Sequence, residues 1–154
     1  MNAARDAAER RARATAEIVA RTGIDAAMIE SLMRHFYGKV REDPLIGPVF
    51  AAKVTDWESH LQRIFAFWSS VALMSGDYRG NPMGLHLPLP IDHEHFDRWL
   101  ALFEASTREV CPPAAAEHFL ERAHRIAQSL EMGIAAGQGV LLGKEERFRR
   151  DAPP

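Results

Sequence analysis

Four side chains at separate points of the sequence have types that could serve one site: Tyr37, His60, His86 and Trp99. A neutral imidazole ligates metals, and a phenol or an indole N–H donates a hydrogen bond to a small polar ligand. A histidine at the edge of an apolar stripe is more often a packed or surface residue, and an aromatic side chain on such a stripe is more often core. Spacing alone therefore leaves the function of these residues undecided.

His86 stands in a short segment bounded by residues that interrupt helices. These residues are Gly80, Pro82, Pro88 and Pro90. Proline has no backbone N–H and glycine has no Cβ, so neither favours a continuing helix. Only a short helical turn fits between them, at about residues 83–87. The segment therefore predicts one imidazole held on a short turn at the edge of a helical core.

Tyr37 lies on a predicted helix that begins after Asp25 and runs to about Glu42. Apolar residues recur along this segment at helical spacing, and Tyr37 borders their stripe. Aspartate is a favoured N-cap because its carboxylate accepts hydrogen bonds from free backbone N–H groups. A loop containing Gly47 and Pro48 is expected to follow.

His60 lies on a second predicted helix, which starts at a capping box in residues 55–58 and ends at about Ser75. His60 borders the apolar stripe of this helix and does not lie on its solvent face. Trp99 lies on the core face of a third predicted helix, which Asp92 caps and which ends before residue 111. Three helices and one short turn would thus carry the four candidate side chains.

These patterns predict an all-α fold with four main helices and short connecting turns, the last helix running from about Ala114 to Ile134. No segment shows the polar–apolar alternation of a strand. Residues 1–22 are rich in alanine, arginine and glutamate and are expected to form a helical or flexible extension. Residues 23–136 are expected to form one domain, and residues 137–154 a flexible C-terminal tail.

Composition narrows the classes of function. A chain of 154 residues suits one domain, and its formal net charge of −2 gives no basic surface for nucleic acid. No apolar run reaches the roughly 18 residues of a membrane span. The single cysteine, Cys111, fits a reducing compartment. We therefore expect a cytoplasmic monomer that binds neither nucleic acid nor a membrane.

Several segments, taken in order, resemble the truncated globins, and most of all their third group. The sequence FYGKVREDPLIGPVF (36–50) resembles the family's second helix with its distal tyrosine, and WESHLQRIFAFW (57–68) resembles the distal helix. YRGNPMGLH (78–86) resembles the segment that ends in the proximal histidine, and FDRWLALFE (96–104) resembles the helix with the pocket tryptophan. The resemblance covers roughly residues 24–134.

This resemblance implies a truncated globin-like two-on-two helical sandwich around haem b. His86 would be the proximal ligand of the iron, and Tyr37 and Trp99 would donate hydrogen bonds to the ligand on the other side. His60 would lie on that distal side, where it gates the pocket, donates to the ligand or binds the iron. The iron would be pentacoordinate, or weakly hexacoordinate if His60 binds it.

The resemblance also implies further contacts with the cofactor. The expected cavity walls are Phe50, Ile64, Phe65 and Trp68. The expected partners of the haem propionates are Tyr78, Arg79, Arg63 and Arg98. Leu85 stands where a related group carries a propionate-binding arginine, so the sequence departs from the family pattern there.

The function implied by the resemblance is binding of O2 or another diatomic ligand such as NO or CO, as in oxygen transport. An alternative is a peroxidase-like or NO-detoxifying haem enzyme that uses peroxide or NO. Because the sequence shows no reductase domain, such an enzyme would take its electrons from an external reductase. A third hypothesis needs no cofactor and makes the chain a small helical interaction protein that uses its N-terminal extension.

Overall fold

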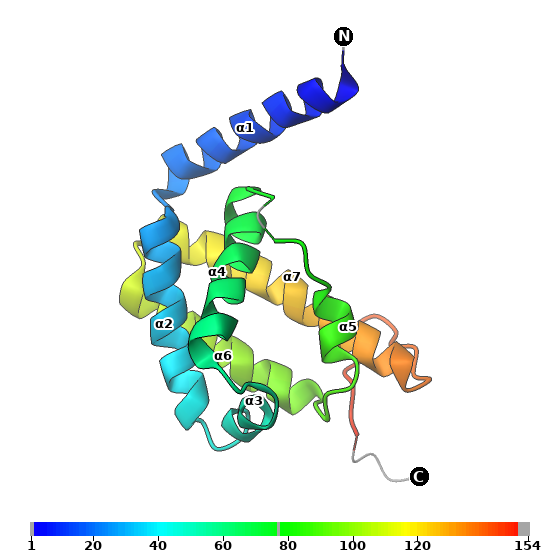
Figure 1. Ribbon diagram of the computed structural model, residues 1–154. Helices are drawn as coiled ribbons and strands as arrows, with labels where there is room; N and C mark the ends of the chain where they lie inside the picture. Colours follow the sequence, from blue (N-terminus) through cyan, green and yellow to red (C-terminus); the bar gives the residue numbers. More distant parts are fainter. Residues whose placement is uncertain (1, 77, 151–154) are drawn as a thin grey trace.

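The computed structural model describes residues 2–76 and 78–150. All regular secondary structure in this part of the chain is helical, which confirms the predicted all-α class. The helices are α1 (Ala3–Thr22), α2 (Ala26–Glu42), α3 (Gly47–Lys53), α4 (Trp57–Leu73), α5 (Pro82–His86), α6 (His93–Val110) and α7 (Pro113–Gly137) (Figure 1). None of these described helices is long and apolar enough to cross a membrane.

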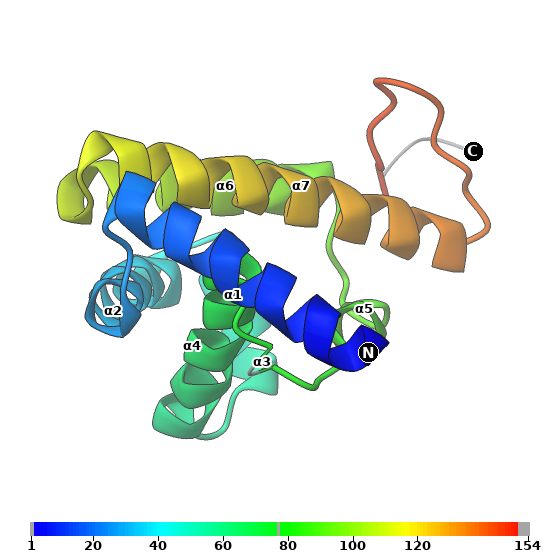
Figure 2. The same ribbon diagram turned by 90° about the horizontal axis from the view of Figure 1, so that it is seen from above.

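Two helix pairs make the core, α2 with α4 and α6 with α7. Helix α2 also packs on α6, and α4 on α7, so the two pairs lie as two layers (Figure 2). Their shared core is aromatic and aliphatic, and its largest fully buried side chains include Phe36, Trp68, Phe103 and Phe119. The two-on-two arrangement is the predicted one, and it leaves the short helix α5 at the edge of the α7 layer.

Helix α1 projects beyond this core in Figure 1, and only its C-terminal half joins the core. Ile18 and Thr22 are buried, and the Thr15 hydroxyl donates a hydrogen bond to the carbonyl of Leu73. The helix ends at Gly23, whose φ of 72° is left-handed and suits glycine. The predicted division into extension, domain and tail stays a prediction, but the extension is helical.

The prediction of a loop at Gly47–Pro48 is wrong, because a helix, α3, forms there. Proline is tolerated in the first turn of a helix, where its missing N–H would have no intrahelical partner. Gly47 also permits a close approach to α2, since a Cβ there would lie 3.0 Å from the carbonyl oxygens of Val40 and Arg41. The tight corner brings Phe50 of α3 back towards α2.

The boundaries of α4 also differ from the prediction. Its N-cap is Asp56, whose carboxylate accepts a hydrogen bond from the Ser59 backbone N–H, and not Thr55. Both residues are good caps, so the sequence pattern alone did not distinguish them. The helix ends at Leu73, because Met74 takes a left-handed φ of 57°.

The C-terminal tail makes contacts that the sequence pattern did not indicate. Phe148 is only 4% exposed and packs with Ile91, Phe96 and Ile134 in a second apolar cluster. The last described residues thus lie against α6, α7 and the loop between α5 and α6.

Candidate functional site

Helix α5 presents His86 with a defined tautomer. The Nδ1 atom of His86 lies 2.6 Å from the carbonyl oxygen of Pro82. A carbonyl oxygen only accepts, so Nδ1 carries the proton and donates, and Nε2 keeps its lone pair. An imidazole held in this way is the form that ligates a metal through its free nitrogen. The half-buried ring of His86 is therefore prepared to bind a metal.

Two contacts fix the position of α5. The Asn81 side chain caps the helix by accepting a hydrogen bond from the Gly84 backbone N–H, at 3.0 Å. Met83 lies against Gly133 of α7, where an added Cβ would fall 2.3 Å from the Met83 Sδ. The only helix on which α5 packs, within the described part of the chain, is α7.

Tyr37, Phe50, Trp57 and His60 form an aromatic cluster at the junction of α2, α3 and α4. The ring centroids of Tyr37 and His60 lie 6.2 Å apart at 88°, and those of Trp57 and His60 lie 5.5 Å apart at 89°. Phe50 closes the third side, 5.7 Å from Tyr37 and 6.4 Å from His60. The structure therefore brings together Tyr37, His60 and Phe50, which the sequence had placed in one pocket.

Tyr37 and Trp99 approach each other from α2 and α6. Tyr37 is 6% exposed, and this burial raises the pKa of its phenol well above the ordinary value, while a hydrogen bond with the Trp99 side chain partly opposes the shift. The phenol therefore keeps its proton at physiological pH. Because an indole can only donate, a hydrogen bond between these two side chains runs from the Trp99 N–H to the Tyr37 oxygen and leaves the phenol proton for another acceptor.

His60 has a buried ring nitrogen that makes no hydrogen bond with the described residues. Its Nε2 has no hydrogen-bond partner within residues 2–76 and 78–150. Burial lowers the pKa of His60, and the positive charge of Arg63, with that of His86 when it is protonated, lowers this pKa further. An unpaired buried polar group costs about 1–3 kcal/mol. A bound group that supplies a partner for this nitrogen would recover that cost.

These features meet the demands of a haem pocket. The His60 and His86 imidazoles lie on α4 and α5, and a protonated His86 lowers the pKa of His60. Half-buried apolar side chains continue from His60 along the same face of α4, at Ile64 and Phe67. A free imidazole nitrogen, a buried nitrogen without a partner among the described residues and apolar side chains beside them would fit a haem.

Phe67 is a candidate wall residue that sequence reasoning missed. Its ring packs edge to face on Tyr78 at 5.2 Å, so it points towards the segment that leads to His86. The signal was present in the spacing, because Phe67 follows His60 by seven residues and Ile64 by three and so shares their helix face.

Two expected wall residues have other surroundings. Trp68 is 2% exposed and stacks on Phe103 at 5.1 Å, so it lies in the main core between the layers. The Phe65 ring lies under the guanidinium of Arg34, 5.3 Å from it, on the α2 side of α4. Their expected contact with the cofactor stays a prediction, and their observed contacts are with protein.

The four expected propionate partners differ in availability. Arg98 is bound to the buried carboxylate of Asp43, so it already has an anionic partner. Arg63 donates to the Ser59 hydroxyl at 3.2 Å. The Tyr78 hydroxyl lies against Gly80, where a Cβ would be 2.1 Å away. Arg79 is exposed and makes no hydrogen bond or ion pair with the described residues, so it is the most available of the four.

Comparisons with known proteins agree with this geometry. The profile of the bacterial-like globins matches residues 20–132. The chain is similar to the group 3 truncated hemoglobin ctb of Campylobacter jejuni, with 37% identity over 113 residues that cover 70% of this chain and 89% of that protein. It is also similar to the group 2 truncated hemoglobin YjbI of Bacillus subtilis, with 28% identity over 80 residues, 51% of this chain and 61% of the other.

A solved structure extends the similarity to the fold. The crystal structure of the group III truncated hemoglobin from Campylobacter jejuni superposes with a TM-score of 0.67 at 38% sequence identity. The superposition covers 70% of this chain and 89% of that one.

Proposed function

This chain belongs to the bacterial-like globin family as a truncated haemoglobin that resembles group III, and we propose that it binds O2 or a related diatomic ligand on haem b held by His86. Membership of the family implies a haem cofactor and small ligands. The ligand set, the distal donors and the choice among O2, NO and CO belong to the proposal.

Haem b, when bound, would supply an iron that can take one diatomic ligand. His86 is the proposed proximal ligand, because the hydrogen bond from Nδ1 to Pro82 leaves Nε2 free and directs the ring. The proposed apolar walls are Phe50, Ile64 and Phe67. Arg79 and Tyr78 are the proposed partners of the propionates.

The distal side chains supply hydrogen bonds to the ligand. The buried phenol of Tyr37 keeps its proton, and Trp99 holds the phenol oxygen, so the Tyr37 O–H donates to a ligand in the pocket. His60 is neutral because burial lowers its pKa. Its unpartnered Nε2 interacts with the same ligand or closes the pocket when none is bound.

The hydrogen bond between His86 Nδ1 and the Pro82 carbonyl is the observation that carries this proposal. The test is titration of the full chain with haem, followed by absorption spectra of the ferric, ferrous, O2-treated and CO-treated protein. We expect an intense haem band that shifts on addition of O2 or CO. His86→Ala should lose the proximal ligand, while His124→Ala, an exposed control on α7, should behave as the parent does. Equal haem uptake by His86→Ala would contradict the proposal.

A peroxidase-like activity is a second candidate, favoured by the orphaned Nε2 of His60. A neutral imidazole beside a haem can accept a proton from peroxide, and such general base catalysis contributes typically 10²–10⁴-fold. The test is oxidation of a phenolic dye by peroxide, which His60→Leu should slow by about that factor. Unchanged turnover in His60→Leu would exclude this role for the imidazole. The NO-detoxifying alternative is tested with NO and an added reductase in the same variants.

A further inference from the structure

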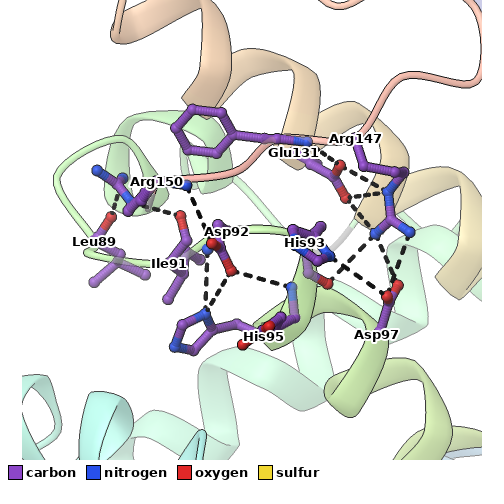
Figure 3. Close-up of polar contacts among 11 residues, drawn as sticks. Leu89, Ile91, Asp92, His93, His95, Asp97, Glu131, Arg147 and Arg150 are labelled. Atoms are coloured by element: carbon purple, nitrogen blue, oxygen red, sulfur yellow. Dashed lines mark hydrogen bonds and ion pairs between the residues drawn. The ribbon is translucent and has the colours of Figure 1, made fainter. Parts of the chain in front are cut away.

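Residues 147–150 lie across the loop that follows His86 (Figure 3). We call these four residues the C-terminal clasp. They follow residue 132, where the family match ends, so the family pattern gives no role for them. Arg147, Phe148 and Arg150 make hydrogen bonds to α6, α7 and this loop.

We infer that the C-terminal clasp positions the proximal histidine, with Arg150 as the positioning residue. This inference rests on the proposed function of His86. The Arg150 guanidinium donates to the carbonyl oxygens of Leu89, at 2.9 Å, and Ile91, at 2.8 Å. Leu89 in turn donates its backbone N–H to the carbonyl oxygen of His86, at 3.0 Å. One residue, Leu89, thus connects Arg150 to the backbone of His86.

The clasp continues through Asp92, the residue that caps α6. The Arg150 backbone N–H donates to one carboxylate oxygen of Asp92 at 3.2 Å, and the Glu94 backbone N–H donates to the other at 3.1 Å. Burial acts to raise the pKa of Asp92, but these bonds and that from His95 outweigh it and hold the pKa below its ordinary value. The clasp therefore holds the loop between α5 and α6 at its middle and at its α6 end.

The other half of the clasp is anchored in the core. The Arg147 guanidinium binds both oxygens of Glu131, with the shortest distance 2.8 Å, and reaches Asp97 at 2.7 Å (Figure 3). The Glu131 side chain is only 7% exposed, so its charge needs this partner. The same carboxylate accepts a hydrogen bond from the Phe148 backbone N–H, and the Phe148 carbonyl oxygen accepts one from the His93 backbone N–H.

The loop needs such support because its own backbone hydrogen bonds are local: the N–H groups of Leu87, Leu89 and Ile91 donate to carbonyl oxygens two to four residues earlier. Two of its residues are prolines, which offer no backbone N–H, and Leu87 is 39% exposed. Helix α5 has a single turn and packs on one helix, α7, in the described part of the chain. Without the clasp, the peptide groups after His86 would exchange their protein partners for water, and the orientation of the imidazole would be less restricted.

The test compares Arg150→Ala with Arg149→Ala in the full chain. Arg149 is an exposed neighbour that makes no hydrogen bond or ion pair with the described residues, so it is a matched control. For Arg150→Ala we expect a shifted or broadened iron–histidine stretching band in the resonance Raman spectrum of the ferrous ligand-free protein. Loss of a charged donor at two carbonyls should also speed transfer of haem to an acceptor protein about tenfold. Arg149→Ala should match the parent in both.

A second measurement does not need haem. Hydrogen exchange at the Leu89 and Ile91 amides of the haem-free chain should be faster in Arg150→Ala than in Arg149→Ala. An unchanged stretching band and haem transfer in folded Arg150→Ala would overturn the clasp and leave the proposed function intact. Absence of haem uptake by the parent would overturn the proposed function, and with it the purpose assigned to the clasp.

Discussion

The rings of Tyr37 and His60 meet edge to face, with their centroids 6.2 Å apart at 88°. One side chain comes from α2 and the other from α4, so the packing of these two helices sets the distance. The phenol keeps a proton to donate and the imidazole has a nitrogen without a partner. A hydrogen-bond donor on Tyr37 and an unpaired nitrogen on His60 thus lie in one cluster of aromatic side chains.

Replacing Tyr37 by phenylalanine should speed release of O2. The substitution removes a buried donor while keeping the ring that packs on Phe50 and His60. A hydrogen bond of this kind is worth about 1–3 kcal/mol, so the O2 dissociation rate should rise by about one to two decades. Stopped-flow displacement of O2 by CO measures that rate. The CO dissociation rate is the internal control, because CO carries less negative charge and should gain less from the donor.

Trp99→Phe should also speed O2 release, and its effect should not add to that of Tyr37→Phe. The indole N–H holds the phenol oxygen, so removing either residue disturbs the other's interaction with the ligand. Groups in one hydrogen-bond network show interaction energies of about 0.5–3 kcal/mol in double-mutant cycles. The measurement is the O2 dissociation rate of the parent, both single variants and the double variant. Additive effects would show that the two donors act independently.

The stability of the protein should fall on the acid side of neutrality, in part through His118. This buried histidine donates from Nε2 to the Ala72 carbonyl at 2.9 Å, and its Nδ1 accepts from Arg21 of α1. Burial lowers its pKa, and the charges of Arg122 and Arg21 add to the shift, opposed by the Ala72 hydrogen bond and by Glu121. The unfolded chain therefore binds the proton first as the pH falls, so stability is full above about pH 6.5 and declines below it.

Urea unfolding of the full chain at pH 7.5 and 5.5 measures this effect. His118→Gln keeps a side-chain N–H for Ala72 but does not titrate, so its stability should fall less between the two pH values. The titration of one group changes the free energy of unfolding by at most about 1.4 kcal/mol per pH unit. His124→Gln, on the exposed side of α7, should retain the parental pH dependence. If His118→Gln lost as much stability between the two pH values as the parent does, His118 would not be the group responsible.

The resemblance to the truncated globins predicted the grouping of Tyr37, His60 and Phe50. Residue types and helical spacing predicted the fold class and the caps Asp25 and Asp92. These depend on local rules, in which one cap or one helix face is decided within a few residues. The environments of Trp68 and Phe65 were less predictable, since both border the stripe of α4 and only the packing of neighbouring helices decides which partner each meets.

The partners of the tail could not be predicted for a related reason. Residues 147–150 read as a charged end, and nothing near them in the sequence indicates Glu131, Asp97 or the loop after His86. Glu131 is buried on the inner side of α7, where a carboxylate is unexpected without a cation. The sequence pattern shows each charge, whereas the pairing of Arg147 with Glu131 needs the folded chain.

Replacing Asn81 by alanine should weaken the retention of haem, although Asn81 is exposed and is not a proposed haem contact. Its side chain caps α5 by accepting the Gly84 backbone N–H at 3.0 Å, and the first residue of that helix, Pro82, supplies the carbonyl that orients His86. Loss of such a cap costs about 1 kcal/mol, which corresponds to roughly fivefold faster haem release. Haem transfer to an acceptor protein measures the rate. Asn81→Asp retains a capping oxygen and should stay near the parental rate, so equal rates for the alanine and aspartate variants would show that the cap does not act on His86.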